Sequence, residues 1–136
     1  MAGPSILVLS YAGCSTCKKA LAWLAARGVS PTVRPIVDEP PTAAELARWI
    51  PRSGKAVRKW LNTSGLSYRA IGKAKIDAAT DAELTAWLTR DGKLVKRPVC
   101  VIGERVLVGF DEAAYDAAFP RLRSSERSVA ISRAPG

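Results

Sequence analysis

Hydrophobic and polar residues follow two kinds of pattern along this chain. A short apolar run at 6–9 predicts a buried strand, and apolar residues at helical spacing over 14–27, followed by Gly28, predict a helix. The segment 32–37 predicts a second strand, in which Pro35 indicates an edge position or an early end. Strand, helix and strand in this order predict a βαβ unit with a right-handed crossover.

The middle of the chain, about 41–92, is predicted to be mostly helical. Two Thr-x-x-Glu sequences, which begin at Thr42 and Thr80, are capping boxes that open helices. The first of these helices is expected to end before Pro51, because proline lacks the amide hydrogen that a helix interior uses. The segment 57–61 predicts a shorter helix between them.

Two apolar runs at 98–102 and 105–110 flank a two-residue turn, which predicts an antiparallel hairpin. Asp111 is expected to cap a last short helix. The order βαβ, helices, ββα predicts an α/β fold with a thioredoxin-like mixed sheet and a helical insertion between its halves.

The 136 residues are enough for one domain with a core of its own. We expect this domain over 1–120 and a flexible basic tail over 121–136, which contains four Arg and one Glu. The apolar run at 6–9 is much shorter than a signal-peptide core or a membrane span, so the expected location is the cytoplasm.

Charge and composition narrow the chemistry. The chain carries 21 Lys and Arg against 12 Asp and Glu, a formal net charge of +9. This excess favours anionic partners, such as an oxyanion, an acidic protein surface or nucleic acid. The chain contains no histidine, which excludes Ser-His-Asp triads, Cys-His protease pairs and His-ligated metals.

The CxxC pair Cys14 and Cys17 lies where the first predicted helix begins. A thiolate at a helix N-terminus is stabilised by unpaired amides and the helix dipole, and Lys18 and Lys19 add positive charge, so Cys14 is the natural nucleophile. Cys17, about one turn on, can attack an adduct on Cys14 as a resolving thiol.

Two other interpretations of the cysteines are weaker. Zinc needs about four ligands, and one CxxC with the distant Cys100 is too few, so no metal site is predicted. A packing role for the pair is the other alternative. Cys100 itself is expected to be a buried strand residue, because its neighbours in 99–102 are apolar.

Four segments together resemble the Spx/arsenate-reductase (ArsC-like) family of thioredoxin-fold proteins. The similarity runs from about residue 6 to residue 119, and the segments fall in the family's order. They are GCSTCKKA at 13–20, LNTSG at 61–65 followed by Tyr68-Arg69, KRPV at 96–99, and LVGF at 107–110.

The resemblance implies a set of site residues. Cys14 is expected to attack the substrate and Cys17 to resolve the adduct, while Arg97 holds an oxyanion through the paired donors of its guanidinium. Pro98 is expected to be a cis proline that faces the redox cysteine. The substrate-binding residues are expected to be Ser15, Thr16, Lys18, Asn62, Arg69 and Pro98.

The resemblance also implies an activity. We expect a thiol-dependent reductase that converts arsenate to arsenite, with no bound cofactor and with glutathione/glutaredoxin or thioredoxin as the external donor. The alternatives are an Spx-like redox-sensing regulator that binds the C-terminal domain of the RNA polymerase α subunit, and a general thiol-disulfide oxidoreductase. We expect a monomer without membrane contact, and no direct reading of DNA, because no helix carries a clustered row of basic residues.

The chain departs from the family pattern at two positions. Glutaredoxin-dependent arsenate reductases resemble one another in having three arginines around the anion. Here Arg97 matches one of them, Asn62 stands where the second is expected, and Val108 or Gly109 where the third is expected. Candidate substitutes are Arg58, Arg69 and Arg105.

Overall fold

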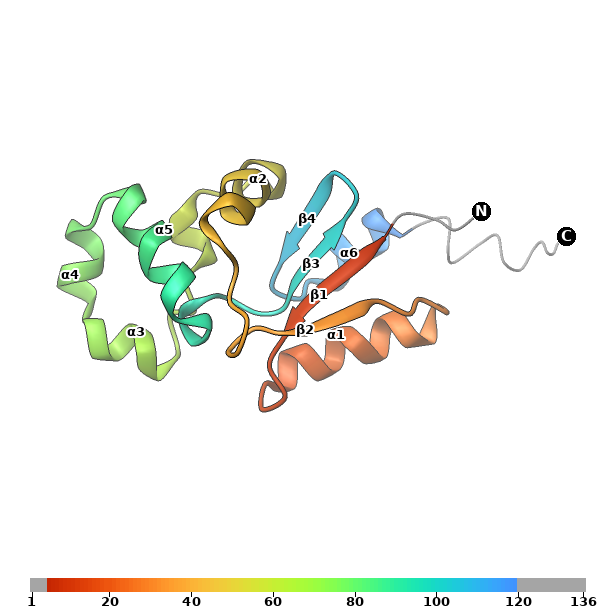
Figure 1. Cartoon of the computed structure of the whole chain (residues 1–136). Coiled ribbons are helices and arrows are strands. Elements are labelled where there is room, and N and C mark those ends of the chain that lie inside the picture. Colours follow the sequence, from red (N-terminus) through yellow and green to blue (C-terminus); the bar gives the residue numbers. More distant parts are fainter. Residues whose placement is uncertain (1–4, 120–136) are drawn as a thin grey trace, which may run out of the picture.

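The computed structural model describes residues 5–119, so the predicted basic tail at 121–136 lies outside the described residues. A four-stranded sheet forms the centre in the order β2-β1-β3-β4 (Figure 1). The strands are β1 (Ile6–Ser10), β2 (Thr32–Pro35), β3 (Val99–Ile102) and β4 (Arg105–Val108). β1 pairs with β2 in parallel, and β3 pairs with β1 and with β4 antiparallel. The predicted mixed sheet is therefore confirmed, with β2 at an edge and ending at Pro35.

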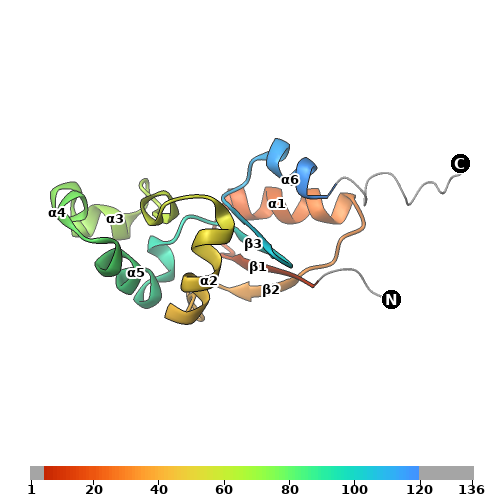
Figure 2. The ribbon, with the colours of Figure 1, turned by 90° about the horizontal axis from the view of Figure 1, so that it is seen from above.

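Helices cover both faces of this sheet. Helices α1 (Ser15–Ala26) and α6 (Glu112–Ala118) lie together on one face, and α2 (Ala43–Ser53) lies on the other (Figure 2). Neighbouring strand residues point to opposite faces. Val8 and Cys100 accordingly join the hydrophobic cluster under α1 and α6, while Leu9 and Val99 join the cluster on the α2 side.

The insertion lies at one end of the sheet (Figure 1). After α2 it contains the 3₁₀ helix η1 (Val57–Trp60), α3 (Leu66–Ile71), α4 (Lys73–Ala78), α5 (Asp81–Arg90) and the 3₁₀ helix η2 (Gly92–Leu94). Both predicted capping boxes are present, at the start of α2 and of α5. Within residues 5–119, no helix is long and apolar enough to cross a bilayer.

The insertion is attached to the sheet through its two ends. Arg34 of β2 donates hydrogen bonds to both carboxylate oxygens of Glu45, at 2.8 and 2.9 Å, and the same carboxylate closes the capping box of α2. At the other end, Gly92 lies so close to the main chain that an added Cβ would stand 2.0 Å from the Ile36 carbonyl oxygen. Only glycine fits that contact.

Two details of the sequence prediction were wrong. Helix α2 does not end before Pro51 but continues to Ser53, so the proline lies within the last turn although it cannot donate a helical hydrogen bond. The helix ends at Gly54, which has φ +70° and donates to the Pro51 carbonyl at 3.2 Å. Asp111 holds the N-cap position of α6, but its side chain makes no capping hydrogen bond.

Candidate active site

The turn between β1 and α1 presents the two cysteines. Cys14 is the N-cap residue of α1, with extended backbone, and its amide donates to the Tyr11 carbonyl at 3.0 Å. The Cys14 side chain is only partly buried. Cys17 lies one turn further along and is 1% exposed. The more accessible thiol is therefore the one at the helix terminus.

Neighbouring groups favour ionisation of Cys14. Its partial burial opposes a negative charge, but hydrogen bonding from the Cys17 main chain and side chain, together with the hydrogen bonding and charge of Arg97, outweighs burial. The result is a pKa of the Cys14 thiol below its ordinary value. A thiol of lowered pKa that solvent can reach has the properties of a nucleophile.

The pKa of the Cys17 thiol is shifted in the opposite direction to that of Cys14. Burial, reinforced by the adjacent Cys14, raises the pKa of the Cys17 thiol, although hydrogen bonding from the Tyr11 main chain and the Ser10 side chain opposes the change. Cys17 is thus held neutral while Cys14 ionises. This division of roles suits a nucleophile and a resolving thiol.

Arg97 stands beside Cys14 with part of its guanidinium unused. One Nη donates to the Lys93 carbonyl at 3.1 Å, and the guanidinium carbon lies 5.1 Å from the ring centroid of Tyr11. The buried Nε has no hydrogen-bond partner in the described part of the chain. The bond from Arg97 to Pro98 is cis, as expected. The guanidinium is therefore held in place beside Cys14, and it brings a positive charge to this site.

A hollow of about 420 Å³ opens next to these groups. Of the predicted site residues, it is lined by Cys14, Thr16, Asn62 and Arg97. It is also lined by Ser64, Gly65, Lys96, Gly109 and Phe110, for which no role was predicted from the sequence. The signal for Lys96 was its place directly before Arg97 in the KRPV segment.

Several predicted residues do not line this hollow. Ser15 and Lys18 are exposed on α1, and Pro98 is buried. Arg69 is exposed and donates to the Ser64 carbonyl at 3.4 Å.

The candidate substitute arginines lie elsewhere as well. Arg58 donates to the carbonyls of Ile76 and Ala79 at 2.9 and 2.6 Å, so its donors hold α4 in place. Arg105 pairs with Ile102 beside the hairpin turn. Neither residue lines the hollow.

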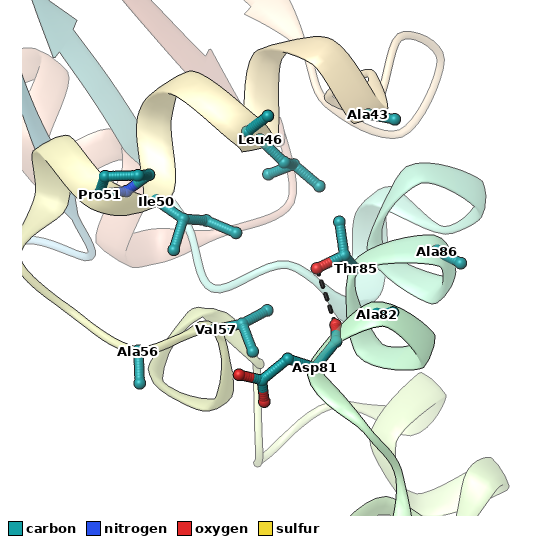
Figure 3. A pocket seen from close by; sticks show the side chains of 11 residues that line it. Ala43, Leu46, Ile50, Pro51, Ala56, Val57, Asp81, Ala82, Thr85 and Ala86 are labelled. Atoms are coloured by element: carbon teal, nitrogen blue, oxygen red, sulfur yellow. Dashed lines mark hydrogen bonds between the residues drawn. The ribbon is translucent and has the colours of Figure 1, made fainter.

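Another hollow, of about 580 Å³, lies between α2 and α5 (Figure 3). Its lining is apolar except for Asp81 and Thr85, and the Thr85 hydroxyl donates to the Asp81 carbonyl at 2.8 Å. It contains neither a thiol nor a cationic side chain. The nucleophilic chemistry therefore belongs to the hollow beside Cys14.

The third cysteine is buried in the sheet, as predicted. Cys100 is 0% exposed, and burial raises its pKa to about 12. Within residues 5–119, no group of three or more His, Cys, Asp or Glu side chains is placed to hold a metal ion.

Comparison with known proteins identifies the family. The ArsC family model matches residues 9–118. The chain belongs to the ArsC family. This ArsC-family chain is 37% identical to the Bacillus subtilis (strain 168) protein YusI over 107 residues, 78% of the chain and 91% of YusI.

Solved structures agree with this membership. An ArsC family related protein from Bacteroides fragilis is 44% identical, with a TM-score of 0.79 over 83% of the chain and 97% of that structure. A "possible arsenate reductase" from Streptococcus mutans UA159 is 34% identical, with a TM-score of 0.76 over 86% of the chain and 100% of that structure. The ArsC-family fold is thioredoxin-like, and membership indicates a thiol-dependent reductase.

Proposed function

We propose that this ArsC-family protein is an arsenate reductase that uses Cys14 as its nucleophile. The observation that carries the proposal is the site geometry. A thiol of lowered pKa stands beside the guanidinium of Arg97, and Cys17 lies one helical turn beyond Cys14 in α1. These are the groups needed to attack an oxyanion, to hold it, and to release the reduced product.

The first step forms a bond between sulfur and arsenic. The Cys14 thiolate attacks the arsenic of arsenate, and one arsenate oxygen, after protonation, leaves as water. Arg97 neutralises the negative charge of the remaining oxygens, because a guanidinium donates to tetrahedral oxyanions in a fork geometry. Arsenic is still in the +5 state in this adduct.

The second step transfers two electrons. The Cys17 thiol loses its proton, its thiolate attacks the Cys14 sulfur, and the sulfur-arsenic bond breaks with its electron pair moving to arsenic. Arsenic then leaves as arsenite in the +3 state, and a Cys14–Cys17 disulfide remains. A thioredoxin dithiol reduces this disulfide. In the external route, glutathione attacks in place of Cys17, and glutaredoxin reduces the mixed disulfide.

The test is arsenite production with each donor system, glutathione/glutaredoxin and thioredoxin/thioredoxin reductase. Cys14→Ser abolishes arsenite formation with both. Cys17→Ser abolishes the thioredoxin-supported reaction, whereas Cys100→Ser, the matched control, retains the wild-type preference for donor. If the wild type produced no arsenite with the first donor system and none with the second, the proposal would be contradicted.

A second candidate is a general thiol-disulfide oxidoreductase, and the size of the hollow favours it. At about 420 Å³ the hollow falls in the range of roughly 300–1,000 Å³ that is usual for small-molecule sites, which is larger than one tetrahedral oxyanion needs. In this reaction the Cys14 thiolate attacks the glutathione sulfur of a mixed disulfide and expels the substrate thiol. Cys17 then attacks the Cys14 sulfur, which releases glutathione and leaves a Cys14–Cys17 disulfide. Turnover of a glutathionylated peptide without arsenate turnover would favour this candidate.

A further inference from the structure

A second cation stands next to Arg97 in the Cys14 hollow. Lys96 and Arg97 are adjacent in sequence, and both line the hollow. The lining contains no carboxylate, and neither residue forms an ion pair within the described range 5–119. No carboxylate of residues 5–119 therefore neutralises their charges, which remain available to an anion.

The main chain of Lys96 is held in place by a hydrogen bond to the core. Its amide donates to the Trp60 carbonyl at 2.7 Å, directly beside the bridge between Leu61 and Val95. Trp60 and Val95 are 0% exposed, so this attachment is part of the core. Lys96 thus starts from a rigid position even though its side chain is exposed.

Gly109 supplies the surface on which the Lys96 side chain lies. The Gly109 amide donates to the Pro98 carbonyl at 2.8 Å, and its φ of +79° is a conformation that favours glycine. A Cβ at this position would stand 3.1 Å from Cε of Lys96 and 3.8 Å from Cδ. The lysine stem therefore runs across the space that the missing side chain leaves.

We propose that Lys96 is the second anion-binding residue of the Cys14 hollow, and that it acts with Arg97 to bind substrates carrying two negative charges. The guanidinium supplies directed donors, while the ammonium supplies a compact positive charge that can follow different anions. The substrate class is a doubly charged oxyanion or a thiol compound with two carboxylates. The anion-binding role of Lys96 does not depend on the proposed function, and only the choice between these two substrates rests on it.

The test compares two alkylating reagents of opposite design. Iodoacetate is anionic and iodoacetamide is neutral, and both react with the same Cys14 thiolate. Their rate ratio therefore cancels any change in thiolate fraction and reports the local positive charge. Peptide mass spectrometry measures both rate constants at Cys14 at low ionic strength, for the wild type and three variants. These are Lys96→Gln, Lys96→Arg, and the control Lys59→Gln, an exposed lysine that does not line the hollow.

Lys96→Gln is expected to lower the iodoacetate-to-iodoacetamide ratio by about threefold to fivefold, as for one charge removed a few ångströms away in a largely aqueous medium. Lys96→Arg retains most of the wild-type ratio, because the positive charge is kept. Lys59→Gln changes the ratio by less than about 1.5-fold, because solvent and salt screen the charge of Lys59. A wild-type ratio in Lys96→Gln, or an equal fall in Lys59→Gln, would overturn the proposal. Failure of the wild type to reduce arsenate would instead count against the proposed function and leave this ratio unaffected.

Discussion

Cys14 and Cys100 carry the same functional group in two very different environments. Cys14 is partly buried at the N-cap of α1, where Cys17 and Arg97 lower its pKa. Cys100 is fully buried in β3 under α1 and α6, where burial raises the pKa to about 12. Burial opposes ionisation at both positions, but it is much deeper at Cys100 than at Cys14. Cys17 and Arg97 outweigh burial at Cys14, whereas hydrogen bonding from Tyr115 does not outweigh it at Cys100. A thiol in this fold becomes reactive where burial is partial and its neighbours stabilise the thiolate.

Cys14→Ser should produce the largest effect, because it removes the ionisable group itself. A serine hydroxyl stays protonated at neutral pH, so rapid alkylation by iodoacetamide at pH 7 should fall to the background rate, on the order of a thousandfold. Cys100→Ala is the matched control and should keep the rapid phase. If the rapid phase survives in Cys14→Ser, the comparison above is wrong.

Arg97→Gln should have the next largest effect, because it removes one of the groups that stabilise the thiolate while leaving the thiol in place. We expect the pKa of Cys14 to rise and its alkylation rate at pH 7 to fall by about threefold to tenfold, because removal of an adjacent positive charge disfavours the thiolate. At high pH the wild-type and variant rates should converge. Arg58→Gln is the control, since the donors of Arg58 bind carbonyls of the insertion. Equal decreases of the Cys14 alkylation rate in both variants would contradict a specific role of Arg97 in stabilising the thiolate.

The raised pKa of Cys100 should lower the free energy of unfolding at alkaline pH. Its pKa in the folded protein is raised, so the folded state binds the thiol proton more tightly than the unfolded state does. The stabilisation is complete below about pH 9 and is lost as the pH rises towards about 12. At pH 10 the free energy of unfolding of wild type, relative to its value at pH 7, should have fallen by about 1 kcal/mol more than that of Cys100→Ala.

Urea unfolding at the two pH values measures this difference. Repeating the comparison with Tyr115→Phe in both proteins removes the phenol, whose pKa is raised by burial and by the neighbouring Cys100. Equal pH dependence of wild type and Cys100→Ala would contradict the burial of the Cys100 thiol.

Lys19→Gln should have the smallest effect. The sequence suggested that Lys19 strengthens the field at Cys14, but the structure places it on the exposed surface of α1. Exposed charges are screened by solvent and salt, so we expect the alkylation rate of Cys14 at pH 7 to change by less than about twofold. A tenfold loss would show that the lysines, rather than Arg97, set the reactivity.

The sequence predicted most of the fold because local signals and the global arrangement agree. The capping boxes at Thr42 and Thr80 form, and β3 and β4 pair as the predicted antiparallel hairpin. The end of α2 was misplaced because the tendency of helices to end before proline is a local rule, and the tertiary structure continues this helix past Pro51 to Ser53. The short helices α3 and α4 were not delimited individually, because six residues give too little periodicity.

The site was predictable in its nucleophile and less so in its binding residues. The spacing of Cys14 and Cys17 before a helix defined the pair, since a CxxC at a helix start is a local feature. The lining of the hollow depends on four distant segments that meet only in the tertiary structure, at Thr16, Asn62, Lys96 and Gly109. Side-chain direction decided which charged residues line it. Arg69 is close in sequence to the lining loop and yet does not line the hollow, while Lys96 does.

One measurement tests the central claim most directly. The alkylation rates of Cys14, Cys17 and Cys100 are followed together in the native wild-type protein, as a function of pH, by peptide mass spectrometry. We predict that Cys14 reacts with a midpoint below that of an ordinary thiol, that Cys17 requires a higher pH than Cys14, and that Cys100 stays unmodified at least to pH 10. A midpoint for Cys14 at or above that of an ordinary thiol, or modification of Cys100 as rapid as that of Cys14, would contradict it.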